Sequence, residues 1–471
     1  MSSYIRPVNS PLLPNLRAIV LGSAGEGCSS AQLFQALAAS SMIRTVSICT
    51  VGVIRRPGFT SAALEDALSK ELEILAQSPS ASQLRHLLIT SPLPLRLLYL
   101  NSLRHVKAFQ HLRTFSVGSV ALDQHLNFLA DLAALEALES LIIRSHTVLD
   151  PLENARTAWN LERVVPANRP FLSAKTGFPV LRQVLLEDEP TQLIHTLELM
   201  KSSTIGIVWM TSTQSATTAF RPLLASLTSR PNIAASLTDL RLTYSIGWDQ
   251  SSSESIRAGS TALIYASLGD IVGPLTQLLA LKTLWLSVGS KIVQISDEDI
   301  AAMGDAWPRL RSLYISVPTD RTLSNQLDML LIAYEVALDV TPSYTLSSLV
   351  HLAIKCRSLR HVDISARPRD VSEDELAAIE SLAPEGGPIA GHNPQTELRY
   401  LFPLSADQSP WLQVSFADVH RLARTLRRLF PRLGRPERQI ERESQAQRMD
   451  PWEEEDKQSE IYKLLQELTA A

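Results

Sequence analysis

Three glycines, Gly22, Gly25 and Gly27, stand between the strand-like pattern of residues 16–21 and the apolar helical pattern AQLFQALAAS. A strand, a glycine-rich turn and a helix in this order are the layout of a nucleotide-binding loop, where backbone N–H groups hold a phosphate. The spacing here is GxxGxG rather than GxGxxG, and no GK[ST] follows. About twenty residues on, where a dinucleotide fold needs an acidic residue, the chain reads Ile43-Arg-Thr-Val46. The pattern favours a turn between a strand and a helix, and a nucleotide-binding protein or enzyme using Gly22–Gly27 is the alternative.

A second group that could carry chemistry is the acidic run Asp297, Glu298 and Asp299 behind Ser296. Acids that hold a metal ion must converge on it, whereas these are adjacent in sequence and have no histidine beside them. Acids in the first turn of a helix are favoured by its dipole, so the run indicates a helix start. No Ser/His/Asp, Cys/His or HExxH spacing is present. We therefore expect no enzyme, no cofactor and no metal.

The elements that position these groups come from one repeated pattern. Leu281-Lys-Thr-Leu284-Trp-Leu286 has leucines at positions one, four and six, the strand half of a leucine-rich repeat. Positions four and six point inward on a short strand, whereas positions three, five and seven point outward. Such units begin at residues 16, 43, 84, 112, 138, 181, 205, 237, 281, 310 and 359.

The spacing of these units predicts the fold class. Helical patterns between the units predict an α/β protein, an irregular solenoid with parallel strands on one face and helices on the other. We assign residues 1–368 to this solenoid. Residues 369–433 are expected to form a capping region with an amphipathic helix, because a solenoid end exposes core leucines. Residues 434–471 are expected to be a charged, partly disordered tail with a terminal helix.

The capping helix is rich in arginine, from Arg421 to Arg438, which could indicate a nucleic-acid patch or a nuclear import signal. The acidic run Glu453–Asp456 follows, and no aromatic residues interleave with the arginines as a stacking platform would require. A solvated helix face is the favoured interpretation. The net charge of −4 likewise gives no reason to expect a nucleic-acid or membrane partner.

The three cysteines, Cys28, Cys49 and Cys356, lie far apart, without a CxxC pair or a disulfide framework. We expect free thiols and a reducing compartment. The N-terminal residues have no apolar h-region, and no apolar stretch approaches the length of a membrane span. Cytoplasm or nucleus is the expected location.

The outward positions of the strands define the candidate binding face. Aromatic rings and arginines displayed on a surface are the residue types that dominate protein–protein binding energy. A sheet face is broad and shallow, whereas small-molecule sites are usually concave, so the expected partner is another protein. The candidate residues are Arg144, Glu187, Trp209, Arg241, Trp285, Tyr314, His361 and Asp363.

The recurring strings LRHLLI, LRTFSV, LESLII, LRQVLL, LKTLWL, LRSLYI and LRHVDI resemble the leucine-rich half of basidiomycete-type F-box proteins. The arginine-rich helix ending in Leu429-Phe-Pro431, followed by an acidic tryptophan segment, is also similar to that family. The resemblance implies a substrate-recognition part of an SCF-like ubiquitin ligase, with a Skp-type adaptor and a cullin ligase as partners. Only fifteen residues precede the first unit, so we expect no F-box in this chain.

Overall fold

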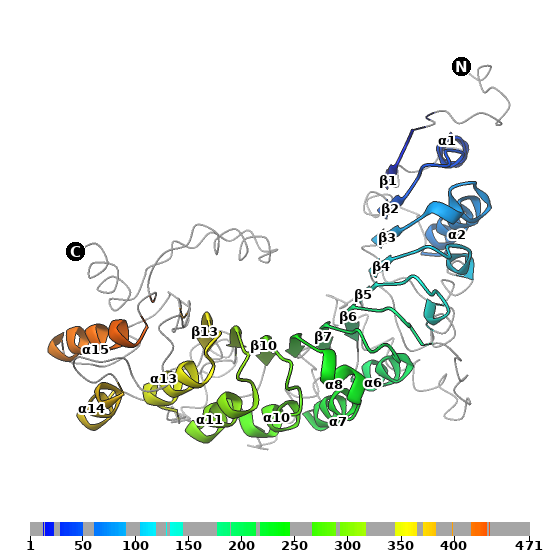
Figure 1. Cartoon of the computed structure of the whole chain (residues 1–471). Helices are drawn as coiled ribbons and strands as arrows, with labels where there is room; N and C mark the ends of the chain where they lie inside the picture. The colour runs from blue at the N-terminus through cyan, green and yellow to red at the C-terminus, as the bar shows by residue number, and fades with distance from the viewer. Residues whose placement is uncertain are drawn as a thin grey trace, which may run out of the picture. The chain divides into compact units, whose positions relative to one another are not determined.

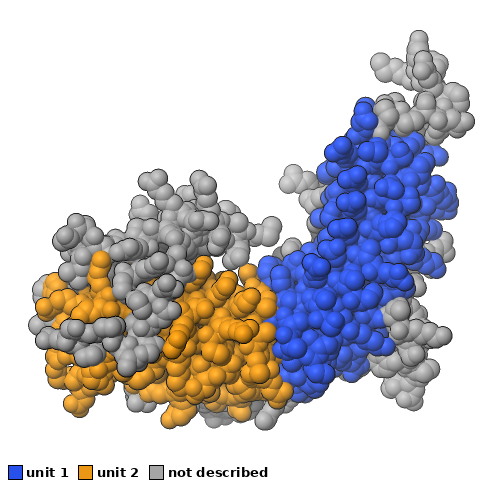
Figure 2. Space-filling model, viewed as in Figure 1, with its two compact units in different colours: residues 1–237 blue, residues 238–471 orange. Residues whose placement is uncertain are grey.

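The computed structural model describes residues 13, 15–22, 29–49, 61–90, 104–118, 129, 132–144, 177–188, 190–212, 217–244, 266–288, 293–316, 344–364, 371–382, 398, 416–430 and 433. The chain divides into two compact units, residues 1–237 and 238–471, coloured separately in Figure 2. The boundaries predicted at residues 368 and 433 both fall inside the second unit.

Eleven strands form one sheet, and their order in the sheet is their order in the chain. Each strand begins two residues after the start of one of the eleven predicted repeats. The prediction of a strand in every repeat is therefore confirmed. The first unit contains β1 (Ala18–Gly22), β2 (Thr45–Cys49), β3 (His86–Thr90), β4 (Thr114–Gly118), β5 (Ser140–Arg144), β6 (Gln183–Asp188) and β7 (Ile207–Ser212). The second contains β8 (Asp239–Tyr244), β10 (Thr283–Val288), β12 (Ser312–Ser316) and β13 (His361–Ile364). Neighbouring strands within each unit pair in parallel, as predicted.

Helices connect many of the strands, and in each unit the helices between strands lie on one face of them (Figure 1). In the first unit they are α1 (Ser29–Ala38), α2 (Ser61–Gln77), α6 (Pro190–Leu199), α7 (Thr217–Thr228) and α8 (Pro231–Ser236), with the short 3-10 helices η2 (Ala81–Gln83) and η3 (Arg104–Ala108). In the second they are α10 (Leu268–Leu275), α11 (Asp297–Ala306), α13 (Leu346–Lys355), α14 (Glu373–Ser381) and α15 (Phe416–Leu429). A separate two-stranded pair joins β9 (Ala266–Ser267) to β11 (Val293–Gln294).

The core lies between the strands and the helices, and the leucine pattern specifies it. Leu281, Leu284 and Leu286, at positions one, four and six of one unit, are each 0% exposed. Trp285 between them is partly exposed, because successive side chains of a strand point to opposite faces. Leu313 is also 0% exposed. The α/β class with an all-parallel sheet is therefore confirmed.

The acidic run behind Ser296 begins α11, as predicted. Ser296 and Asp299 form a capping box, in which each side chain accepts a hydrogen bond from the backbone N–H of the other. Asp297 Oδ1 accepts hydrogen bonds from the backbone N–H of Thr345 at 2.7 Å and from its hydroxyl at 3.0 Å. The acids therefore serve two helix starts, α11 and α13. Within the described residues no group of three or more His, Cys, Asp or Glu side chains is placed to hold a metal ion.

The first turn of α14 is joined to α13 by Glu375. Its Oε1 accepts a hydrogen bond from the backbone N–H of Ser347 at 3.0 Å, while the Ser372 hydroxyl accepts one from the backbone N–H of Glu375 at 3.1 Å. Burial is the main cause that raises the pKa of Glu375 above its usual value. The N-termini of successive helices are thus joined by acidic side chains.

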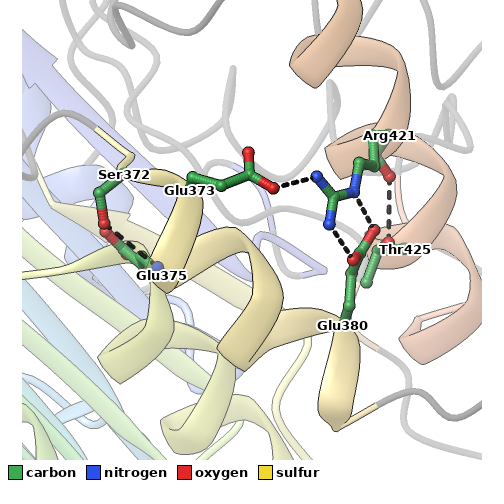
Figure 3. Close-up of polar contacts among 6 residues, drawn as sticks. All are labelled: Ser372, Glu373, Glu375, Glu380, Arg421 and Thr425. Atoms are coloured by element: carbon green, nitrogen blue, oxygen red, sulfur yellow. Dashed lines mark hydrogen bonds and ion pairs between the residues drawn. The ribbon is translucent and has the colours of Figure 1, made fainter.

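The amphipathic helix α15 packs on α14. Its apolar residues Leu422, Leu426 and Leu429 are buried. Arg421 reaches two carboxylates of α14, with Nε 2.6 Å from Glu380 Oε1 and Nη1 2.5 Å from Glu373 Oε1 (Figure 3). A forked guanidinium that binds two carboxylates fixes orientation as well as charge.

The remaining predictions concern cysteines, the membrane and the tail. Cys356 is buried and not in a disulfide, which confirms one of the three predicted thiols. Burial raises the pKa of this thiol to about 12. No described helix is long and apolar enough to cross a membrane. The charged tail from residue 434 onward lies outside the described residues.

Candidate protein-binding face

Three of the eight candidate residues lie on neighbouring strands of the first unit. Arg144 on β5 is the register partner of Glu187 on β6. Trp209 on β7 is the register partner of Leu185, which is two residues before Glu187 and therefore on the same face. Glu187 and Trp209 are partly exposed, as outward positions should be.

The other five candidates lie on the four main strands of the second unit. Trp285 on β10 is the register partner of Arg241 on β8 and of Tyr314 on β12. Tyr314 is in turn the register partner of Asp363 on β13, with His361 two residues before it. The structure therefore brings these five predicted residues together on neighbouring strands of the second unit. We call Arg241, Trp285, Tyr314 and His361 the aromatic row.

Each side chain of the aromatic row contacts the next one on the neighbouring strand. The Trp285 and Tyr314 rings stack with centroids 4.7 Å apart and planes 27° from parallel. The guanidinium of Arg241 lies over the Trp285 ring, 5.5 Å from its centroid, a cation–π geometry. The ring separation is close to the spacing of neighbouring strands, about 4.8 Å. Trp285 and Tyr314 therefore stand upright side by side, with their faces turned to their neighbours in the row.

His361 differs from the prediction. An outward position was expected to display this residue, but it is only 9% exposed, and its ring centroid lies 5.0 Å from that of Tyr314. Burial lowers the pKa of His361 to about 4, so the imidazole is neutral at physiological pH. The ring is therefore a packing partner of Tyr314 at the end of the row rather than a displayed surface group.

The sequence analysis missed Asp239, which lies beside the aromatic row. Its Oδ1 is 3.8 Å from Nε of Arg241, and both side chains are mostly covered. The signal was present in the sequence, because residues two apart on a strand share one face. Asp239 and Asp363 together give the face two carboxylates beside the single guanidinium of Arg241. These three residues carry a net formal charge of −1.

The structure describes only Gly22 of the alternative nucleotide-binding site at Gly22–Gly27. Gly22 ends β1, and residues 23–27 lie outside the described residues. In open α/β sheets nucleotides bind where the strand order reverses. The order of the eleven described strands follows the chain with no reversal. This topology gives the nucleotide-binding alternative no support.

Comparison with known proteins found no protein-family model and no curated protein that matches the chain. The aromatic row and the parallel sheet that carries it are therefore the observations on which a function must rest.

Proposed function

We propose that the chain is a protein-interaction scaffold of the leucine-rich-repeat type, and that the aromatic row is its binding site. One observation carries the proposal. Four neighbouring strands each contribute one member of a continuous row on the outward face. Trp, Tyr and Arg are the residues that most often dominate the energy of protein interfaces.

The geometry of the row favours a protein surface over other partners. Because the faces of Trp285 and Tyr314 are turned to neighbours in the row, these rings cannot accept a stacked base as a nucleic-acid platform does. The net negative charge of Arg241, Asp239 and Asp363 also gives no attraction for a polyanion. Ring edges and polar tips on a flat sheet suit the mixed surface of a folded protein or peptide.

The family resemblance suggests a more specific role. We propose on that basis that the bound protein is a substrate presented to an SCF-like ubiquitin ligase. The resemblance rests on the LxxLxL strings and the arginine-rich capping helix. Purification of the tagged chain from cells, probed for a Skp-type adaptor and a cullin, tests this role separately, because such a complex can form through a further subunit. Absence of both components from the purified material would remove the ligase role and leave the scaffold proposal standing.

Site-specific photocrosslinking in cells tests the scaffold proposal. A photoreactive amino acid replaces Ser316, which is exposed at the end of β12 on the face of the aromatic row. The matched control places the same group at Ala302, which is exposed on α11. We expect one protein to be crosslinked from Ser316, not from Ala302, and to be lost when Trp285→Ala is added. Identical crosslinked products from the two positions would contradict the proposal.

A further inference from the structure

The first compact unit carries a separate row of charged residues at the N-terminal ends of its first four strands. Position two of each of the first four repeat units is an arginine: Arg17, Arg44, Arg85 and Arg113. We call these four residues the arginine row. Each stands immediately before the strand of its unit, from β1 to β4, which lie side by side in Figure 1.

Backbone hydrogen bonds align the four residues of the arginine row with one another from strand to strand. The backbone N–H of Arg44 donates to the carbonyl oxygen of Arg17 at 2.8 Å, that of Arg85 to Arg44 at 2.8 Å, and that of Arg113 to Arg85 at 2.7 Å. Direct bonding of this kind places consecutive members one strand spacing apart, about 4.8 Å. Arg17 and Arg113 are exposed, and Arg44 and Arg85 are partly exposed.

No acid stands next to these arginines along the chain. The residues that precede the four units are Asn15, Met42, Gln83 and His111, and those at position three are Ala18, Thr45, His86 and Thr114. The first acid at position two is Glu139 in the following unit, whose carboxylate lies 3.5 Å from Arg113. The arginine row is therefore a strip of concentrated positive charge on a chain whose net charge is −4.

The fold does not require cations at these positions. The same backbone hydrogen bond between neighbouring units is made at Glu139, at Gly206 and from Lys282 to Thr238. An acid, a glycine and a threonine can thus occupy position two. Like charges that face each other on neighbouring strands repel and destabilise a sheet. The backbone pairing therefore does not account for four arginines in succession, which makes the row a candidate binding feature.

We propose that the arginine row binds an acidic segment of a partner protein, as a surface separate from the aromatic row. Charge complementarity selects an acidic occupant. Two observations favour a protein over a nucleic acid. The residues that flank the row at position three include no Trp, Tyr or Phe, and their one ring, His86, is hydrogen-bonded to Thr114, so they do not form a stacking platform. The whole chain is also net negative. A short acidic segment responds to the local field, because salt screens charges beyond about 8 Å.

Fluorescence anisotropy with the full chain tests this proposal. The probes are a fluorescein-labelled peptide of alternating glutamate and serine, its glutamine counterpart, and a single-stranded DNA. We expect the glutamate peptide to bind, the glutamine peptide not to bind, and the affinity to fall as salt rises. The double variant Arg17→Gln, Arg113→Gln should weaken binding at least about tenfold, since it removes half of the charge of the row. Arg17→Lys, Arg113→Lys should retain most of the affinity.

The matched control is the double variant Lys70→Gln, Lys107→Gln, which changes the net charge equally at exposed cations of α2 and η3. It should bind the glutamate peptide like the parent, and so should Trp285→Ala, which separates this proposal from the aromatic row. Circular dichroism melts establish that each variant is folded. Failure of the parent to bind the glutamate peptide, an equal loss in the lysine control, or tighter binding of the DNA would each overturn the proposal.

Discussion

Trp285 and Tyr314 are register partners on β10 and β12, and their rings stack with centroids 4.7 Å apart. The side chains on either side of each ring in this pair are Leu284, Leu286, Leu313 and Ile315, all of which are buried. One pair of strands therefore carries both the core of the second unit and the centre of its candidate binding face. This allows the fold and the binding site to be tested separately.

The core is tested by truncating Leu284 or Leu313 to alanine. Both side chains are 0% exposed, so each variant should lower the free energy of unfolding by about 2–5 kcal/mol, from lost burial and the cavity left behind. Leu279, which is 67% exposed, is the matched control, and its truncation should cost no more than about 0.5 kcal/mol. Urea unfolding measures all three. Curves for the core variants that overlay the parent would refute the assignment of the core.

The stacking in the aromatic row is tested by a double-mutant cycle. Trp285→Ala and Tyr314→Ala, singly and together, should show a coupling free energy of about 0.5–1.5 kcal/mol, because stacked rings gain more than their buried area. Urea unfolding of the four proteins gives the value. A cycle of Trp285→Ala with Trp209→Ala, whose rings belong to different units, provides the comparison. Strictly additive effects for Trp285 and Tyr314 would show that the rings do not interact.

The buried His361 predicts a pH dependence of stability. Its pKa is about 4 in the folded chain and about 6.5 in the unfolded chain. The unfolded state binds the proton first, so the stabilisation is complete above pH 6.5 and is lost as the pH falls from about 6.5 to 4. The loss is of the order of 3 kcal/mol, from 2.5 pKa units at about 1.36 kcal/mol each. Urea unfolding across this range should show it, and His361→Gln should lack this part of the dependence.

We expect the docking of α15 on α14 to depend on Arg421. Its hydrogen bond lowers the pKa of Glu380, so the pair stabilises the folded state above the usual pKa of a glutamate and loses this effect as the pH falls through the lowered value. Arg421→Met should therefore speed the hydrogen exchange of α15 at neutral pH and weaken its acid dependence. Arg424→Met is the control, because the Arg424 side chain bonds to the carbonyl of His420 in its own helix. Equal exchange in parent and Arg421→Met would contradict the role of this contact.

The sequence predicts the strands well, because burial of Leu281, Leu284 and Leu286 needs only the local alternation of a strand. The same alternation places Arg241, Trp285 and Tyr314 on one face. It cannot predict how much of that face is covered. His361 was expected on the surface and is buried, because its exposure depends on residues packed around it from elsewhere in the chain. The arginine row follows from the sequence only once the backbone bonds between units are known.

The ion pairs show the same limit. Arg421 could be recognised as one arginine of a polar helix face, but its partners Glu373 and Glu380 lie on another helix, at a separation that no local pattern encodes. Asp297 likewise indicated a helix start in the sequence, yet its contact with Thr345 crosses to the next helix. Long-range polar contacts are set by how helices pack, which the periodicity of one helix does not specify.

The affinity of the protein crosslinked from Ser316 for the purified chain tests the central claim most directly. Isothermal titration calorimetry compares the parent with Trp285→Ala and with the exposed-leucine control Leu279→Ala, after circular dichroism has shown that all three are folded. A central aromatic residue of an interface contributes about 2 kcal/mol or more, so we predict a loss of at least about thirtyfold for Trp285→Ala and no change for Leu279→Ala. Equal dissociation constants for the parent and Trp285→Ala would contradict the assignment of the aromatic row as the binding site.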